Sequence, residues 1–196
     1  MEIIIHRVNK IKFLKSIPKN FGVEIDVRSF NSELILNHEP KKNGDKLSNF
    51  LKNYQNGTII FNIKEAGIEK DVITMAKKYK VKSFFLLDVE HPFIFTSKGN
   101  LKNNLSSRFS EFEPLELTNN LRRFVKWVWI DTVNKLPLNN KNLVYLKKYK
   151  TCLVSPERWN RKKDIKNYIN FFKKNKYFPN AVMTDMICAN IWTNNL

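Results

Sequence analysis

The fold is decided by the run Gly22-Val23-Glu24-Ile25-Asp26-Val27-Arg28-Ser29, in which β-branched residues alternate with charged ones. Alternation of this kind is typical of a β-strand, because successive side chains of a strand point to opposite faces. Glu24 and Asp26 are two residues apart and therefore share one face. We expect a strand at 22–29 that carries two carboxylates side by side.

Seven further short apolar runs alternate with amphipathic stretches along the chain. The runs cover residues 2–6, 58–63, 83–88, 105–109, 124–131, 151–155 and 181–185, and the helical stretches cover 45–54, 68–79, 115–123, 139–149 and 162–174, with Asn139 and Asn160 as expected N-caps. Eight strands that alternate with helices favour an α/β fold, a closed (β/α)8 TIM barrel. Typical barrels have about 250 residues. The shorter chain predicts a compact barrel with short helices, formed as a single domain over residues 1–196.

An open, doubly wound sheet is the alternative architecture. Such a sheet would usually carry a glycine-rich turn after its first strand. Here the first run ends at His6 and continues as Arg7-Val8-Asn9-Lys10, without a glycine. Dinucleotide binding is therefore not expected.

The net charge of the chain is +17. A positive surface attracts phosphates at long range, so the partner could be nucleic acid or a small anionic substrate. The lysines occur in pairs that are spread over the chain, at 41–42, 77–78, 147–148 and 173–174. Nucleic-acid modules more often cluster such residues on one face. We therefore favour a small anionic substrate and expect no nucleic-acid partner.

Cysteine use and the start of the chain favour the cytoplasm. Cys152 and Cys188 lie in apolar surroundings and match no metal-ligand spacing, so we expect buried thiols without a disulfide. The N-terminal residues do not form a signal peptide, and no apolar run is long enough to span a membrane. The sequence does not predict the oligomeric state.

Polar residues gather where the predicted strands end, which is where barrel enzymes place their active sites. Glu24 and Asp26 on the second strand repel each other and are costly to bury, and a divalent cation such as Mg²⁺ or Ca²⁺ would resolve the conflict. Asn62, on the next parallel strand, can supply a neutral third oxygen. The alternative is a set of plain ion pairs, in which Glu24 pairs with Arg7 or Arg28 and Asp26 with Lys64.

Two of the three histidines flank this carboxylate pair in the sequence. His6 ends the first strand, and His38 ends a short extended run that follows the second. Imidazole can act as acid or base near neutral pH, so the pair suits hydrolysis of a phosphodiester. Arg7 and Lys64 could hold the phosphate. His91, after the fourth strand, has no predicted role.

Further candidates lie at the ends of the fifth and sixth strands. We expect Arg108 and Trp129 there to contact the substrate. Arg108 belongs to the charged segment 107–114, in which Arg108 and Glu113 could face the mouth. A loop of internal ion pairs is an equally good interpretation of this segment.

Taken in order, these residues resemble a known family. His6-Arg7, then Glu24-Ile25-Asp26, then His38, and finally Asn62 and Lys64 resemble the start of the glycerophosphodiester phosphodiesterases, a branch of the phosphatidylinositol-phospholipase-C-like barrels. The match covers about the first 65 residues. Beyond it, Thr184-Asp185 resembles the end of the family's last strand.

The resemblance implies a TIM barrel with a divalent metal that splits a phosphodiester into a phosphomonoester and an alcohol. In glycerol substrates, a neighbouring hydroxyl would attack first and give a cyclic phosphate. The resemblance also implies that His6 and His38 are the acid and base, that Glu24 and Asp26 are metal ligands, and that Arg7 and Lys64 contact the phosphate.

Three departures from the family pattern stand in the same region. Val8 replaces a glycine, Glu39 replaces an aspartate, and Asn62 replaces a metal-binding glutamate. They motivate an alternative, a barrel that binds a phosphorylated ligand without turnover. A third hypothesis, nucleic-acid binding, rests on charge alone.

Overall fold

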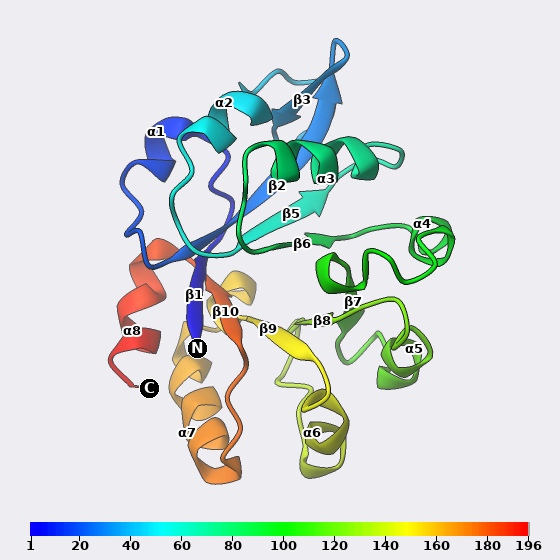
Figure 1. The fold of residues 1–196 in the computed structure, drawn as a ribbon. Coiled ribbons are helices and arrows are strands. Elements are labelled where there is room, and N and C mark those ends of the chain that lie inside the picture. The colour runs from blue at the N-terminus through cyan, green and yellow to red at the C-terminus, as the bar shows by residue number, and fades with distance from the viewer. Residues whose placement is uncertain (196) are drawn as a thin grey trace.

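The computed structural model describes residues 1–195, and its centre is a ring of eight parallel strands (Figure 1). These strands are β1 (Glu2–Ile5), β2 (Gly22–Phe30), β5 (Ile59–Ile63), β6 (Phe84–Leu87), β7 (Ser106–Phe109), β8 (Trp127–Ile130), β9 (Lys150–Val154) and β10 (Ala181–Thr184). The first strand pairs with the last, so the two ends of the chain build the same part of the sheet. The α/β TIM-barrel prediction is confirmed.

The ring follows the order of the chain, apart from one hairpin. β2 pairs with β1 and β5, β5 pairs with β6, and β7, β8, β9 and β10 pair in succession. The seam between β6 and β7 is closed by a parallel bridge between Leu86 and Leu105. The Ser106 hydroxyl also donates to the Leu86 carbonyl across 2.7 Å. The hairpin strands β3 (Glu33–Leu36) and β4 (Asp45–Lys46) extend the sheet from β2.

Short helices surround the ring (Figure 1). The α-helices are α1 (Ile11–Leu14), α2 (Leu47–Lys52), α3 (Glu69–Lys78), α4 (His91–Thr96), α5 (Leu115–Asn120), α6 (Asn140–Leu146), α7 (Ile165–Asn175) and α8 (Ala189–Thr193), and the 3-10 turns are η1 (Lys102–Asn104), η2 (Pro156–Trp159), η3 (Lys162–Asp164) and η4 (Met186–Cys188). The longest helix has 11 residues and the shortest has four, which explains how so short a chain closes a barrel. Among residues 1–195, no helix has the length and apolar character needed to cross a membrane.

The two predicted N-caps have different outcomes. Asn139 caps α6, because its side chain accepts from the backbone N–H groups of Lys141 and Asn142. The prediction for Asn160 is wrong: this residue ends η2 in the left-handed conformation, and α7 begins after Asp164. Asparagine tolerates the left-handed region, so the same residue type can end one turn as readily as it begins another.

The apolar core has two parts. Side chains such as Ile3 and Ile5 pack outward against the helices, whereas Ile4 joins a smaller cluster that fills the inside of the barrel. The members of this inner cluster are Ile4, Ile60, Phe85, Leu87, Trp127, Trp129, Cys152, Val154, Ala181 and Met183. Because side chains alternate along a strand, the residues two positions further along face the mouth of the barrel. Both cysteines are buried and free, as predicted.

Candidate active site at the barrel mouth

Polar residues directly above the inner cluster form the candidate site. Ile4 precedes His6 by two residues, Ile60 precedes Asn62, and Met183 precedes Asp185. On β2 the outward positions are Val23, Ile25 and Val27, which leaves Glu24 and Asp26 pointing inward. The barrel thus brings one histidine, three carboxylates and one amide, carried on or just after four different strands, to one end.

Glu24 is the most enclosed of these groups, with 2% of its surface exposed. Its Oε2 accepts from the backbone N–H of Arg7 at 2.8 Å, and its Oε1 accepts from Asn62 Nδ2 at 2.9 Å. The first contact depends on Arg7, which holds a left-handed backbone conformation with φ of 53°. His6 Nε2 lies 4.0 Å from Glu24 Oε2. Burial raises the pKa of the Glu24 carboxyl, and the charge of Asp26 raises it further.

A prediction about pH follows from the raised pKa of Glu24. The folded state binds the Glu24 proton more tightly than the unfolded chain does, so this group lowers the free energy of unfolding as the pH rises from its ordinary pKa of 4.5 through the raised value. Glu24→Gln cannot titrate, and its stability should therefore fall less than that of the wild type over this window. Denaturant unfolding at a series of pH values measures the difference. An identical pH profile in both proteins would contradict the prediction.

Asp26 lies in a ring of donors. Lys64 Nζ is 3.3 Å from its Oδ1, Arg7 Nε is 3.6 Å from its Oδ2, and Asn9 Nδ2 donates to Oδ2 at 2.7 Å. Asn9 also accepts from the backbone N–H of Asp26 at 2.8 Å. The ion pair with Lys64 is the one that the sequence suggested as an alternative to metal binding. Arg28 instead faces Glu65, at 3.8 Å.

His6 has a second carboxylate neighbour that sequence reasoning left without a role. Asp185 Oδ1 lies 3.5 Å from His6 Nδ1, and Arg158 Nη1 donates to both oxygens of Asp185 at 2.9 and 3.0 Å. The hydrogen bond with His6 and the neighbouring Arg158 lower the pKa of the Asp185 carboxyl. The position of Asp185 at the end of the last strand was the available signal. Asn9 lies in a loop and Arg158 in the 3-10 turn η2, and neither position gave a signal.

His38 forms no hydrogen bond or ion pair with the group of His6, Glu24 and Asp26 in the described structure. It follows β3, and its side chain is 40% exposed. Its Nδ1 is 2.8 Å from Glu39 Oε1, and its carbonyl accepts from Arg28 Nε. Among the described residues, no hydrogen bond or ion pair joins the His38 ring to His6, Glu24 or Asp26. His91, at the start of α4, lies near Phe95 and lines a pocket with Asp88 and Arg108. In the described structure it forms no hydrogen bond or ion pair with His6, Glu24 or Asp26.

Arg108 and Trp129 are in register on the neighbouring strands β7 and β8. Arg108 donates to both carboxylate oxygens of Asp88, at 2.7 and 3.0 Å, and to Asp131 at 3.1 Å, while Glu113 lies 3.9 Å away. Arg108 is therefore held in ion pairs, one with Glu113 of its own segment and the shorter two with Asp88 and Asp131 outside it. Trp129 is 4% exposed in the inner cluster, and its indole N–H has no partner among the described residues.

The donor set can be tested against a divalent cation. Among residues 1–195, no cluster of three His, Cys, Asp or Glu side chains could hold a metal ion. The site does contain two buried carboxylates, and the oxygen of the Asn62 amide is buried without a partner in the described structure. Carboxylate and amide oxygens are the ligands that Mg²⁺ and Ca²⁺ prefer. Glu24, Asp26 and Asn62 therefore fit such an ion in chemical type.

Comparison with known proteins decides the fold family. No protein-family model matches the chain, and no curated protein matches its sequence. A solved glycerophosphoryl diester phosphodiesterase from Parabacteroides distasonis ATCC 8503 superposes with a TM-score of 0.68 at 8% identity, covering 98% of this chain and 86% of that one. The fold is that of the glycerophosphoryl diester phosphodiesterases. A protein from Agrobacterium tumefaciens strain C58, provisionally named as the same enzyme, gives 0.64 at 9% identity over 98% and 97% of the two chains.

Proposed function

We propose that this protein hydrolyses phosphodiesters of the glycerophosphodiester type. The observation that carries the proposal is the meeting of His6, Glu24, Asp26 and Lys64 at the mouth of a barrel whose solved structural neighbours are glycerophosphoryl diester phosphodiesterases. In barrels of this kind the C-terminal ends of the strands form the active site. Water adds to phosphorus, one P–O bond breaks, and a phosphomonoester and an alcohol leave.

We assign to His6 the transfer of a proton in this reaction. Its Nδ1 faces the Asp185 carboxylate, which favours the tautomer with the proton on Nδ1. Nε2 is then free to take a proton from the attacking hydroxyl or water. We assign the opposite transfer, onto the departing alkoxide, to His38. Glu39 beside His38 Nδ1 would orient that ring in the same way.

Positive groups around Asp26 would hold the phosphate. The Arg7 guanidinium is 45% exposed and Lys64 is 18% exposed, so both remain accessible from the mouth. Charged donors of this kind stabilise the negative charge that develops during phosphoryl transfer. Glu24, Asp26 and Asn62 would hold a divalent cation, which would supply further positive charge to the phosphate when bound. Arg108 and Trp129 are proposed to contact the alcohol side of the substrate.

The direct experiment is a hydrolysis panel. The purified protein is incubated with glycerophosphodiesters of different alcohols and with an aryl phosphodiester, in Mg²⁺, Ca²⁺, Mn²⁺ or a chelator. We expect release of alcohol from at least one glycerophosphodiester, with His38→Ala reduced by roughly 100-fold or more. Turnover of no phosphodiester in any of these conditions would refute the proposal.

A second candidate function is ligand binding without turnover. All four oxygens of Glu24 and Asp26 already face protein donors, namely Asn62, Arg7, Lys64 and Asn9. This arrangement could hold a phosphorylated ligand on Arg7 and Lys64 with no reaction following. Calorimetric titration with glycerol phosphate, run beside the hydrolysis panel, separates the two functions.

A further inference from the structure

Among the described residues, the two most exposed large apolar side chains lie at the end of the barrel that carries the candidate site. Ile187, in η4 after β10, is 81% exposed, and Phe112, in the loop after β7, is 68% exposed. Trp159 in η2 and Met186 in η4 are exposed at 41% and 38%. All four follow the C-terminal ends of barrel strands. Single exposed apolar residues need no explanation, but their gathering around one mouth does.

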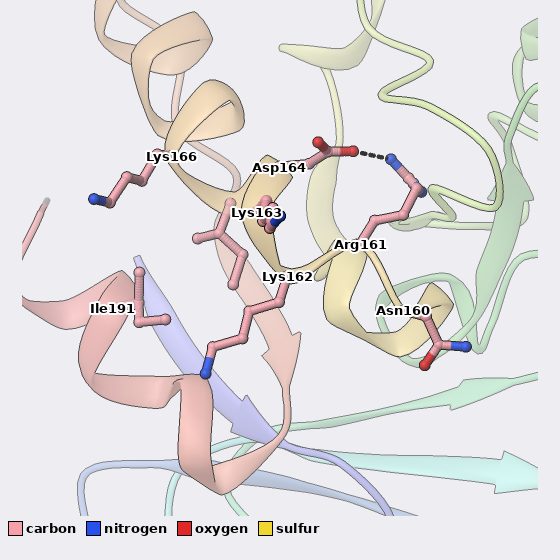
Figure 2. Close-up of a pocket in the computed structure, with 8 residues that line it drawn as sticks. Asn160, Arg161, Lys162, Lys163, Asp164, Lys166 and Ile191 are labelled. Carbon is pink, nitrogen blue, oxygen red and sulfur yellow. Dashed lines mark hydrogen bonds and ion pairs between the residues drawn. The ribbon is translucent and has the colours of Figure 1, made fainter.

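A cleft of about 820 Å³ between η3 and α8 adds positive charge to the same rim (Figure 2). Lys162, Lys163 and Lys166 line it together with Ile191, and Figure 2 shows Lys162 extending toward the helix that carries Ile191. In the described residues none of these three lysines forms an ion pair. Arg161 is different, because Asp164, Tyr168 and the Thr132 carbonyl bind its guanidinium.

We propose that this rim, comprising Phe112, Trp159, Met186, Ile187 and the lysines 162, 163 and 166, binds an anionic lipid surface and that the substrate is a phosphodiester carried in that surface. The inference rests on the proposed function, because the substrate it names would enter the same mouth.

Charge and polarity together identify a lipid surface as the partner. Lysines near an anionic membrane each contribute attraction, and exposed apolar side chains gain by entering the boundary between headgroups and acyl chains. Nucleic acid would use the lysines through its phosphates, whereas an anionic membrane would use both the lysines and an exposed aliphatic side chain such as Ile187. Trp159 links the rim to the site, since its indole N–H donates to Asp131 Oδ1 at 2.9 Å. Asp131 in turn accepts from Arg108 at the mouth.

Vesicle binding tests the surface without reference to catalysis. The full chain is sedimented with vesicles of phosphatidylcholine alone and of phosphatidylcholine mixed with phosphatidylglycerol. We expect binding to the anionic vesicles only. Ile187→Ser should weaken it about tenfold, and the double variant K162A/K163A about 30-fold.

Matched controls come from the same chain. Val144→Ser removes a side chain that is 62% exposed on α6, away from the rim, and should leave vesicle binding unchanged. K173A/K174A removes the same charge from the far end of α7 and should weaken binding much less than K162A/K163A. Equal losses for the two lysine pairs would show attraction by overall charge and would overturn the proposal.

Other results would overturn the proposal without touching the proposed function. One is that the protein binds no vesicles. The other is that it binds duplex DNA in a way that depends on Lys162 and Lys163 but not on Ile187. If vesicles bind as expected, hydrolysis of a lysophospholipid in mixed anionic vesicles should lose activity with Ile187→Ser, while hydrolysis of a soluble glycerophosphodiester should not. Equal activity of Ile187→Ser on both substrates would remove the substrate assignment. Failure of all hydrolysis would reject the proposed function and leave the vesicle result standing.

Discussion

The His6→Ala variant is expected to lose phosphodiester hydrolysis by roughly 100-fold to 10,000-fold in kcat/KM. His6 is the only histidine whose ring is held between two site carboxylates in the described structure, with Asp185 on one side and Glu24 on the other. Alanine removes the group that would move the proton and leaves the phosphate contacts in place. Steady-state kinetics on the best substrate of the hydrolysis panel measures the loss.

Folding has to be checked beside the kinetics, because His6 is 13% exposed and replacing it removes packing. Thermal unfolding of the variant provides that check. The matched control is His91→Ala, which removes the same side chain from α4 and should keep full activity. Asp185→Asn provides a second variant that preserves shape. It should lower activity, because a neutral amide holds the Nδ1 proton of His6 less strongly than the Asp185 carboxylate does. Activity of His6→Ala within threefold of the wild type would contradict the assignment.

The sequence predicted the barrel well because the strands and helices follow regular patterns of apolar and polar residues. Alternation along 22–29 placed Glu24 and Asp26 on one face, and the structure turns that face inward. The predicted strand at 124–131 was too long, and β8 covers only Trp127–Ile130. Apolar residues before a strand look the same as apolar residues within it. The first and last residues of a strand are set by hydrogen bonds to the neighbouring strands, and these bonds cannot be predicted from residue type alone.

Side-chain partners at the site could be predicted only in part. The pair between Asp26 and Lys64 followed from two neighbouring parallel strands, since Asp26 is in register with Asn62 and Lys64 lies two residues further along. The alternative in which Glu24 pairs with the guanidinium of Arg7 or Arg28 is not observed. Arg28 faces Glu65, and the backbone N–H of Arg7 binds Glu24 while the Arg7 side chain reaches Asp26. A left-handed turn at Arg7 causes this, and residue types alone do not encode it. Likewise, the sequence did not predict the contacts of Asn9, in a loop, or of Arg158, in η2.

Replacing Asn62 distinguishes a divalent-cation site at Glu24 and Asp26 from a set of plain ion pairs, and the replacement should have a large effect on stability. Asn62→Glu places a third carboxylate beside Glu24, whose pKa is already raised by burial and by Asp26. In a chelator we expect the variant to lose about 3 kcal/mol of stability, because an uncompensated charge is buried. With a divalent cation the third oxygen ligand should reverse the loss. A free cation at about 100 times its Kd would contribute about 2.7 kcal/mol.

Thermal and denaturant unfolding in a chelator, Mg²⁺ and Ca²⁺ measure both effects without any need for catalysis. Asn62→Gln is the matched control, since it has the length of glutamate but keeps a neutral amide, and it should show no added response to cations. If the wild type is also stabilised by a cation, Glu24, Asp26 and the Asn62 oxygen suffice to bind it. If only Asn62→Glu responds, the positive charges of Arg7 and Lys64 serve the wild-type site in place of a metal. Unfolding of Asn62→Glu that is the same in chelator and in cation would show that this corner of the barrel cannot bind a divalent ion.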